Sequence, residues 1–324
     1  MKAIKVTAAL MLFGLVAVST LAAAPSWNFS IGTSTLGGSF YIMGTPFAKV
    51  ITEKVPNVIA TVQATNGPSA NIQLMERGEM KLAYVSSAAA YEGWNGLSWA
   101  KGVKYQRMRT MFTTYSSYFE MVTLSKLPIK TIRDLAGKRV HMSMPNGTPD
   151  IAMRYCLELL NIVPKDKLYM QTEQALDQLK DGKLDVVIFA MGLPTSMILD
   201  LQATHDIRMV DISPEDLNTV ASQYPYFAKA VIPAGTYENM PKDINTFAFW
   251  NYSVCDKDLP DDLVYQMTKA VFENKKDFEA ASSYGKELFA KNIVNAVVPL
   301  HPGAVKYYKE IGIDIPQNLL PPTD

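Results

Sequence analysis

Three short turns in this sequence carry residue types that could bind a small anion through the protein backbone. They are Gly37-Gly38-Ser39, Ser86-Ser87 and Asn146-Gly147-Thr148, and each lies between a strand-like stretch and the expected start of a helix. Glycine permits close approach of the backbone, and the first N–H groups of a helix are unpaired and lie at the positive end of its dipole. Taken singly, each turn is better explained as a helix cap, because Ser, Asn and Gly are preferred there. Taken together, the three favour one anion-binding site.

Aromatic residues and one further loop could form the walls of such a site. Phe40, Tyr41, Tyr91 and Tyr115 could supply ring faces or hydroxyl contacts, although Phe40 suits a core-facing position better. A contact to the Tyr41 hydroxyl would make Tyr41→Phe weaken binding about two- to tenfold, because one hydrogen bond contributes about 0.5–1.5 kcal/mol. The loop Met191-Gly192 follows a strand-like stretch and would close the site from the other side.

The sequence lacks the motifs of common enzyme and metal sites. Its three histidines, His141, His205 and His301, have no metal-ligand spacing to another His or to a Cys. There is no H-E-x-x-H, C-x-x-C, G-x-S-x-G or G-x-G-x-x-G motif, and Gly137-Lys138 is not followed by the Ser or Thr of a phosphate-binding loop. A catalytic triad assembles in space, so a periplasmic hydrolase stays an alternative. We expect a binding protein without metal or cofactor rather than an enzyme.

The turns lie within an alternation of short apolar strands and amphipathic helices, which predicts an α/β fold with a largely parallel sheet. One series of strand, turn and helix covers residues 28–91, and a similar series covers residues 139–189. Two long strand-like stretches, 110–123 and 246–254, could carry the chain between two lobes. We therefore expect lobe 1 at residues 27–115 and 252–324, lobe 2 at residues 116–251, and a hinged ligand cleft between them.

Residues 1–24 are typical of a secretory signal peptide. Lys2 and Lys5 precede an apolar run over residues 8–18, and Ala22-Ala23-Ala24 supplies the small residues of a cleavage site. An uncleaved membrane anchor is the alternative, since residues 6–24 carry no charge. Because no later stretch approaches 18 consecutive apolar residues, we expect an exported, soluble periplasmic protein.

The charge balance also limits the classes of partner. Lys+Arg and Asp+Glu both number 31, and without the two lysines of residues 1–24 the balance becomes 29 against 31, a net charge of −2. No basic excess is available for nucleic acid, so we expect no nucleic-acid partner. Cys156 and Cys255 could pair in an oxidising compartment, but a chain of this length needs no disulfide, and we favour two buried free thiols.

Several segments resemble the TAXI family, the extracytoplasmic solute receptors of one class of TRAP (tripartite ATP-independent periplasmic) transporters. The most specific are residues 31–41, 60–67 and 78–85, and residues 91–96 and 258–265 are also similar. The stretch 129–140 resembles the second-lobe entry of many type II periplasmic binding proteins. The resemblance implies a monomeric, type II periplasmic-binding-protein-like clamp of two α/β lobes. Such a receptor closes on a small carboxylate, such as glutamate or 2-oxoglutarate, and delivers it to a permease driven by an ion gradient.

The resemblance also adds Ser34 and Asn66 to the expected site. Two departures from the family pattern leave the identity of the ligand open: Ser34-Thr35-Leu36 replaces part of a glycine-rich turn, and Pro145-Asn146 replaces a Gly-Ser pair. Asn146 is expected to tolerate the left-handed backbone that glycine would take. The full set of expected ligand-binding residues is Ser34, Gly37, Gly38, Phe40, Tyr41, Asn66, Ser86, Ser87, Tyr91, Tyr115, Asn146, Gly147, Thr148, Met191 and Gly192.

Two other roles are compatible with the same fold. The protein could be the substrate-binding component of an ABC importer, in which case its gene would neighbour an ATPase gene rather than a TRAP permease gene. It could also be a ligand-sensing module for a membrane receptor, in which case deleting the gene would abolish a response but not uptake.

Overall fold

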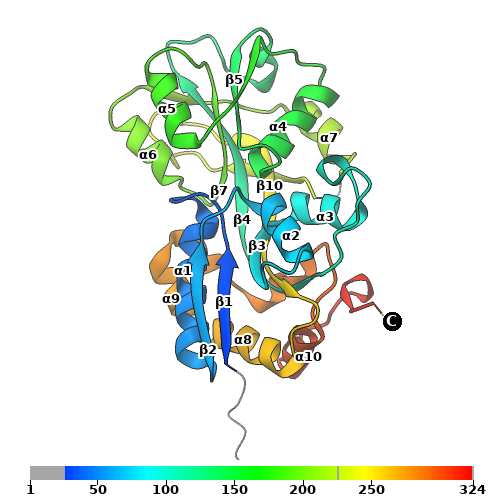
Figure 1. Ribbon diagram of the computed structural model, residues 1–324. Helices are drawn as coiled ribbons and strands as arrows, with labels where there is room; N and C mark the ends of the chain where they lie inside the picture. The colour runs from blue at the N-terminus through cyan, green and yellow to red at the C-terminus, as the bar shows by residue number, and fades with distance from the viewer. Residues whose placement is uncertain (1–25, 225, 323–324) are drawn as a thin grey trace, which may run out of the picture.

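The two lobes of the protein are joined by two long strands that run side by side through both of them (Figure 1). A computed structural model describes residues 26–224 and 226–322; the expected signal peptide, residues 1–24, lies outside the described residues. Across the described ranges, no helix has the length and apolar character needed to cross a membrane.

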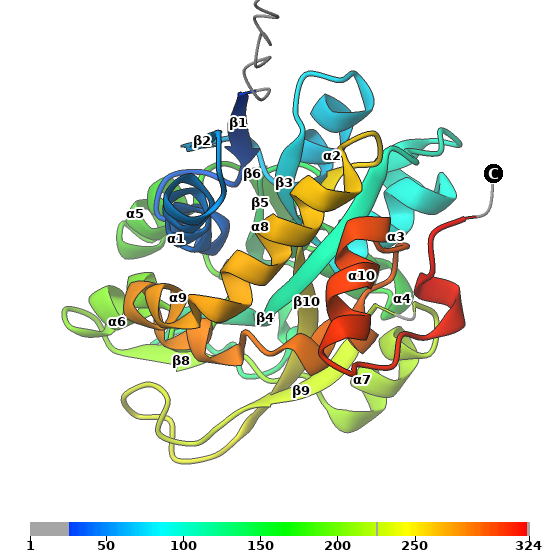
Figure 2. The same cartoon turned by 90° about the horizontal axis from the view of Figure 1, so that it is seen from below.

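The lower lobe in Figure 1 is built from the first part of the chain and its C-terminal helices. Its elements are β1 (Trp27–Gly32), α1 (Ser39–Lys54), β2 (Val58–Gln63), α2 (Pro68–Glu76), β3 (Leu82–Ser86), α3 (Ser87–Asn95), α8 (Asp261–Glu273), α9 (Lys275–Ala281) and α10 (Pro302–Glu310). As expected for the C-terminal tail, α8 and α9 pack back against α1, and α10 packs on α8 (Figure 2). The end of the chain thus completes the lobe that its start begins.

The two connecting strands are β4 (Met108–Leu124) and β10 (Ile244–Asp256). They pair with each other in antiparallel register, from Ala248 opposite Tyr118 to Asp256 opposite Met108. The lobe boundaries that we expect, between residues 115 and 116 and between 251 and 252, fall inside these strands. β4 is buried along nearly all of its length, so the connection belongs to the core rather than to an exposed linker.

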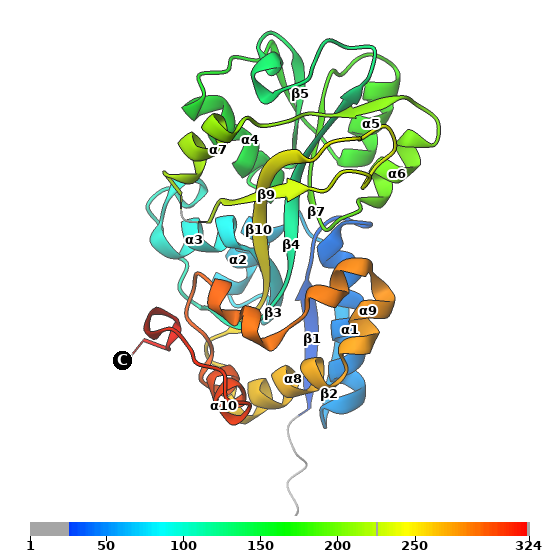
Figure 3. The same cartoon turned by 180° about the vertical axis from the view of Figure 1, so that it is seen from behind.

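The upper lobe contains the middle of the chain (Figures 1 and 3). Its elements are β5 (Arg139–Ser143), α4 (Thr148–Leu159), β6 (Asp166–Tyr169), α5 (Thr172–Lys180), β7 (Val187–Met191), α6 (Ser196–Gln202), β8 (Ile207–Met209), α7 (Pro214–Ala221) and β9 (Ala228–Ile232). Short 3-10 helices occur at Ser98–Ala100, Ile132–Leu135, Ser283–Glu287, Ala290–Asn295 and Gln317–Leu319.

The expectation of a largely parallel sheet is wrong. The main sheet has the order β2-β1-β3-β10-β4-β7, with β9 added to β10 and β8 added to β4. Within it, β1 is parallel to β2 and β3, whereas every pairing of β4 or β10 is antiparallel. The two strands that cross between the lobes run in opposite directions, and this converts a parallel α/β arrangement into a mixed sheet.

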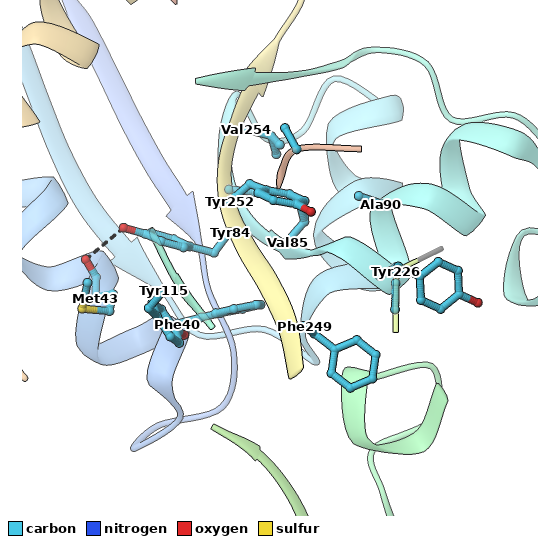
Figure 4. Packing of buried hydrophobic residues seen from close by; sticks show 14 of the residues in the cluster. Phe40, Met43, Tyr84, Val85, Ala90, Tyr115, Tyr226, Phe249, Tyr252 and Val254 are labelled. Atoms are coloured by element: carbon cyan, nitrogen blue, oxygen red, sulfur yellow. Dashed lines mark hydrogen bonds between the residues drawn. The ribbon is translucent and has the colours of Figure 1, made fainter. Parts of the chain in front are cut away.

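Large aromatic side chains fill the core on both faces of the central strands (Figure 4). Phe40 on α1 packs against Tyr84 on β3 with ring centroids 5.8 Å apart, and the buried Tyr84 hydroxyl donates to the Met43 carbonyl at 3.1 Å. Cys156 and Cys255 are buried free thiols, as predicted. The core therefore holds the first turn of α1 in place, and this turn lies at the boundary between the lobes.

Candidate functional site

A cavity of about 110 Å³ lies between the two lobes, where β1, β5 and β7 end. One bound water needs about 10–15 Å³, so there is room for a small organic molecule. Both lobes contribute to the lining: Ser34, Thr35, Gly38, Ser39, Phe40, Asn66, Gly67, Pro68, Ser117, Ser143, Met144, Gly147, Thr148, Pro149, Thr172, Glu173, Phe189, Ala190, Met191 and Met197.

Four helices begin at this cavity, and none of them is capped by a side chain. The N-cap residues of α1, α2, α4 and α5 are Gly38, Gly67, Gly147 and Gln171, and none makes a side-chain hydrogen bond to the helix. The first N–H groups of a helix have no partner within it, and the N-terminal end of its dipole is positive. Uncapped helix starts from both lobes around one cavity are suited to binding an anion.

A side chain in place of the glycine would be crowded at two of these helix starts, more severely at Gly38 than at Gly147. A Cβ on Gly38 would lie 2.4 Å from the Ser34 hydroxyl oxygen and 3.1 Å from the Thr35 carbonyl oxygen. A Cβ on Gly147 would lie 3.1 Å from the Met144 carbonyl oxygen. A side chain at either position would therefore push against the turn that presents the helix start.

The remaining lining is apolar apart from hydroxyl groups, one amide and one carboxylate. Phe40 enters from the lower lobe, and Phe189 and Met191 enter from the end of β7. Among the lining residues Glu173 is the only charged one, and no Lys or Arg is present. The positive potential for an anion would thus come from backbone groups rather than from basic side chains.

Seven of the fifteen residues expected from the sequence line this cavity. They come from both lobes: Ser34, Gly38, Phe40, Asn66, Gly147, Thr148 and Met191. Their role as ligand contacts stays a prediction. Two more, Gly37 and Asn146, border the cavity without lining it. Gly37 faces the other lobe, since a Cβ there would lie 3.9 Å from Glu173 Oε1. Asn146 has the predicted left-handed backbone, with φ of 61°.

The turn Ser86-Ser87 does not line the cavity. The Ser86 hydroxyl is already used, whereas the Ser87 hydroxyl is buried without a hydrogen-bond partner in the described chain. The Ser86 hydroxyl oxygen accepts from the Ala89 N–H at 3.4 Å and caps α3. It also accepts from the Thr148 hydroxyl at 2.8 Å. Both Ser86 and Ser87 are buried. Ser86 therefore supports Thr148, which lines the cavity, and a ligand contact at this third helix start stays a prediction.

Four other expected residues also lie away from the cavity lining. Tyr115 is fully buried, and its ring packs on Tyr284 with centroids 4.7 Å apart. Gly192 packs on the same ring, since a Cβ there would lie 2.3 Å from Tyr284 Cδ1. Tyr91 packs beside Tyr226 with centroids 5.5 Å apart, and Tyr41 is half-buried on α1. The rings of Tyr91 and Tyr115 therefore pack against other tyrosines and do not line the cavity.

Sequence reasoning missed the contribution of α5 and of the strand ends. Thr172 and Glu173 lie at a helix start that follows a strand, which is the criterion that found Gly38 and Gly147. No glycine, serine or asparagine marks this helix start, so the residue types that predict the other turns do not predict this one. Ser143 ends β5, three residues before Asn146 of the expected turn, and has φ of 61°. Ser117 lies in the middle of β4, and nothing local in the sequence distinguishes it.

Direct contacts between the lobes border the cavity on the side of α2 and α3. The Ser69 hydroxyl on α2 donates to the Asn146 carbonyl at 2.6 Å. Further out, the buried Glu92 carboxylate on α3 accepts from the hydroxyls of Tyr155 at 2.6 Å and Tyr226 at 2.8 Å. Burial raises the pKa of Glu92, and the two tyrosine hydroxyls oppose that rise. The lobes are therefore in contact along one border of the cavity.

Comparisons with known proteins agree with this architecture. The family described as "NMT1-like family" matches residues 31–312 of the chain. A structure from work on glutathione import via GshT and the cystine ABC importer TcyBC of Streptococcus mutans has a TM-score of 0.52 at 13% identity, covering 82% of this chain and 98% of that one. A periplasmic transporter has a TM-score of 0.52 at 14% identity, covering 82% and 94%. An ancestral arginine-binding protein bound to arginine has a TM-score of 0.51 at 12% identity, covering 81% and 98%. These likenesses concern the fold, which is the two-lobed α/β fold of type II solute-binding proteins.

Proposed function

The chain belongs to the NMT1-like family, and from that premise we propose that it is a periplasmic solute receptor. In this role it binds a small organic carboxylate, such as an amino acid or a dicarboxylate, and delivers it to the membrane permease of a TRAP transporter. It acts as a monomer that binds and releases its ligand without chemical change.

One observation carries the proposal: uncapped helix starts from both lobes surround a cavity that no basic side chain lines. Backbone N–H groups at α1 and α4 suit the carboxylate of a ligand. The rings of Phe40 and Phe189 give an apolar wall against which the organic part of a ligand could pack. Inorganic phosphate and sulfate have no such apolar part. A small organic acid uses both kinds of surface.

The fold also supports a receptor that closes on its ligand. The chain passes between the lobes in β4 and β10, while the ligand-facing turns belong to different lobes. A carboxylate that binds α1 of one lobe and α4 of the other has a higher affinity for the closed protein than for the open one. The ligand therefore shifts the equilibrium toward the closed form. The closed form is then the state that a permease would recognise.

A thermal-shift screen of carboxylates at millimolar concentration tests the proposal. A ligand that binds only the folded state stabilises it by about 2.7 kcal/mol at one hundred times its Kd. We expect one structural class of carboxylate to raise the unfolding temperature, and Gly147→Val to abolish that rise. If no carboxylate stabilises the wild-type protein, the proposed function is wrong.

A receptor for an ABC importer is the second candidate, and the fold likeness to a structure from work involving a cystine ABC importer favours it. The two candidates share the ligand site and differ in the energy source of transport. Dissipating the ion gradient should stop uptake by cells if the partner is a TRAP permease. Depleting ATP while the gradient is kept should stop uptake if the partner is an ABC importer. A neighbouring gene for a multi-span permease or for an ATPase gives the same distinction.

A further inference from the structure

Glu173 is the one charged side chain that lines the cavity, and it lies in the first turn of α5. Its Oε1 is 3.9 Å from the position that a Cβ on Gly37 would take, so the carboxylate faces the turn of the opposite lobe. In the described part of the chain it has no hydrogen-bond or ion-pair partner. Glu173 is exposed, so its carboxylate lines the cavity with no protein partner among the described residues and is open to solvent or to a ligand.

We propose, on the basis of the proposed function above, that the ligand is a small zwitterion, such as an α-amino acid, and that Glu173 binds its ammonium group. The starts of α1 and α4 supply N–H donors for the ligand carboxylate, while Glu173 supplies an acceptor for its amine. The cavity then matches a molecule with one anionic and one cationic end.

A favourable interaction with the dipole of α5 does not by itself account for Glu173. An acidic residue in the first turn of a helix is favourable anywhere on the surface. Asp150 holds the equivalent place in α4 and has ordinary partners: its Oδ2 accepts from the Asn146 N–H at 2.7 Å and from Arg154 Nε at 3.2 Å. Asp150 is buried, whereas Glu173 is exposed at the cavity and has no protein partner in the described chain, so its oxygens are open to water or to a ligand that enters the cavity.

The same carboxylate selects against ligands that have only acidic groups. A dicarboxylate without an amine would place a second negative charge in a cavity whose one charged side chain is already negative. Of the two ligand types that the resemblance implies, glutamate fits this arrangement and 2-oxoglutarate does not. Glu173 is therefore a specificity-determining residue for the amine.

Calorimetric titration with paired probes tests the inference. The pairs are L-glutamate with glutarate, L-leucine with 4-methylpentanoate, and L-phenylalanine with 3-phenylpropanoate, so that each pair differs only in the α-amine. We expect at least one amino acid to bind and its amine-free partner to bind at least tenfold more weakly. Glu173→Gln should weaken the amino acid about ten- to a hundredfold, as expected for the loss of a charge-assisted hydrogen bond, and should not weaken the amine-free acid.

Asp177→Asn is the matched control, because it removes one carboxylate from the exposed face of the same helix, where Asp177 pairs with Lys180 at 3.0 Å. It should leave every affinity unchanged. If the amine-free acids bind wild type as tightly as the amino acids, and Glu173→Gln changes neither, the inference is overturned while the proposed function stands. If the wild-type protein binds neither kind of probe, and no carboxylate in the wider thermal-shift screen stabilises it, both the inference and the proposed function are wrong.

Discussion

The hydroxyl of Tyr155 on α4 donates a 2.6 Å hydrogen bond to Glu92 on α3 and so joins the two lobes through a buried carboxylate. The same Glu92 oxygen accepts from Tyr226 at 2.8 Å, while its other oxygen is buried without a partner in the described chain. Tyr155 and Tyr226 belong to an aromatic cluster with Tyr224 and Phe227. On the side of the upper lobe, aromatic rings thus surround the buried Glu92 carboxylate.

Removing either tyrosine hydroxyl should loosen this contact. We expect Tyr155→Phe and Tyr226→Phe each to lower the free energy of unfolding by about 1–3 kcal/mol, because each takes a donor from a buried carboxylate. The double variant should lose more than the sum, since Glu92 is then left with neither donor. Urea denaturation measures both effects.

Tyr105→Phe is the control for that series, because Tyr105 is half-buried against Trp99 and its hydroxyl has no hydrogen bond within residues 26–224 and 226–322. It should leave the unfolding free energy within about 0.5 kcal/mol of wild type, as is usual for a change that breaks no buried contact. Equal stabilities for Tyr155→Phe and Tyr105→Phe would contradict a stabilising role for the Glu92 contact.

Gly38→Val should abolish ligand binding and leave the lobes folded. A Cβ at this position meets the Ser34 hydroxyl oxygen and the Thr35 carbonyl oxygen, so a branched side chain displaces the turn from which α1 starts. Leu36→Ala is a suitable control in the same turn, because Leu36 is exposed and does not line the cavity. For both variants, binding is measured as the rise in unfolding temperature that the most stabilising carboxylate of the screen produces. Normal binding by Gly38→Val would rule out the α1 start as part of the site.

The lining of the cavity and the sequence alone lead to different expectations for Tyr41→Phe. The sequence places Tyr41 one residue after Phe40 and suggests a hydroxyl contact to the ligand, but Tyr41 lies outside the cavity lining and is half-buried on α1. We now expect Tyr41→Phe to bind the ligand with an affinity within about twofold of wild type, because it removes no hydrogen bond from the site. A tenfold loss of ligand affinity in calorimetric titration would instead show that the Tyr41 hydroxyl contacts the ligand.

The local parts of the fold could be predicted from the sequence, and the pairing of distant strands could not. Gly78 and Gly182 end helices because each takes a positive φ, of 77° and 70°, and such endings are visible in the residue type. The antiparallel pairing of β4 with β10 joins strands about 130 residues apart, and nothing within either strand encodes its direction relative to the other. The mixed sheet was missed for that reason.

The site could be predicted at helix starts that remain uncapped. Gly38 and Gly147 were predicted because glycine permits close approach of the backbone at a helix start. The structure makes both of them N-caps without a side-chain hydrogen bond, and both line the cavity. Ser86 has the residue type of a binding turn, yet its hydroxyl caps α3 itself, and only the geometry reveals which role it takes. Glu173 was not predicted, because glutamate is not a residue type that favours close approach to backbone N–H groups, although the start of its helix is visible in the sequence.

Raising the pH should destabilise the upper lobe through Glu120. This carboxyl is fully buried on β4, where it accepts hydrogen bonds from the hydroxyls of Thr195 and Tyr237. Burial raises the pKa of Glu120 from 4.5 to about 8, and the two hydroxyls only partly oppose that rise. Between these values the folded protein holds a proton that the unfolded chain releases. The stabilisation is therefore complete below pH 4.5 and is lost as the pH rises through about 8.

Glu120→Gln isolates this effect, because the amide stays neutral at every pH. For wild type, this one group should lower the free energy of unfolding by about 1.4 kcal/mol for each pH unit within that window. The variant should lack that component of the slope, so the difference between the two proteins should change steadily from pH 5 to pH 8 in urea denaturation. Glu53→Gln, at an exposed position on α1, should keep the slope of wild type. Parallel pH profiles for wild type and Glu120→Gln would show that Glu120 is already ionised in the folded protein.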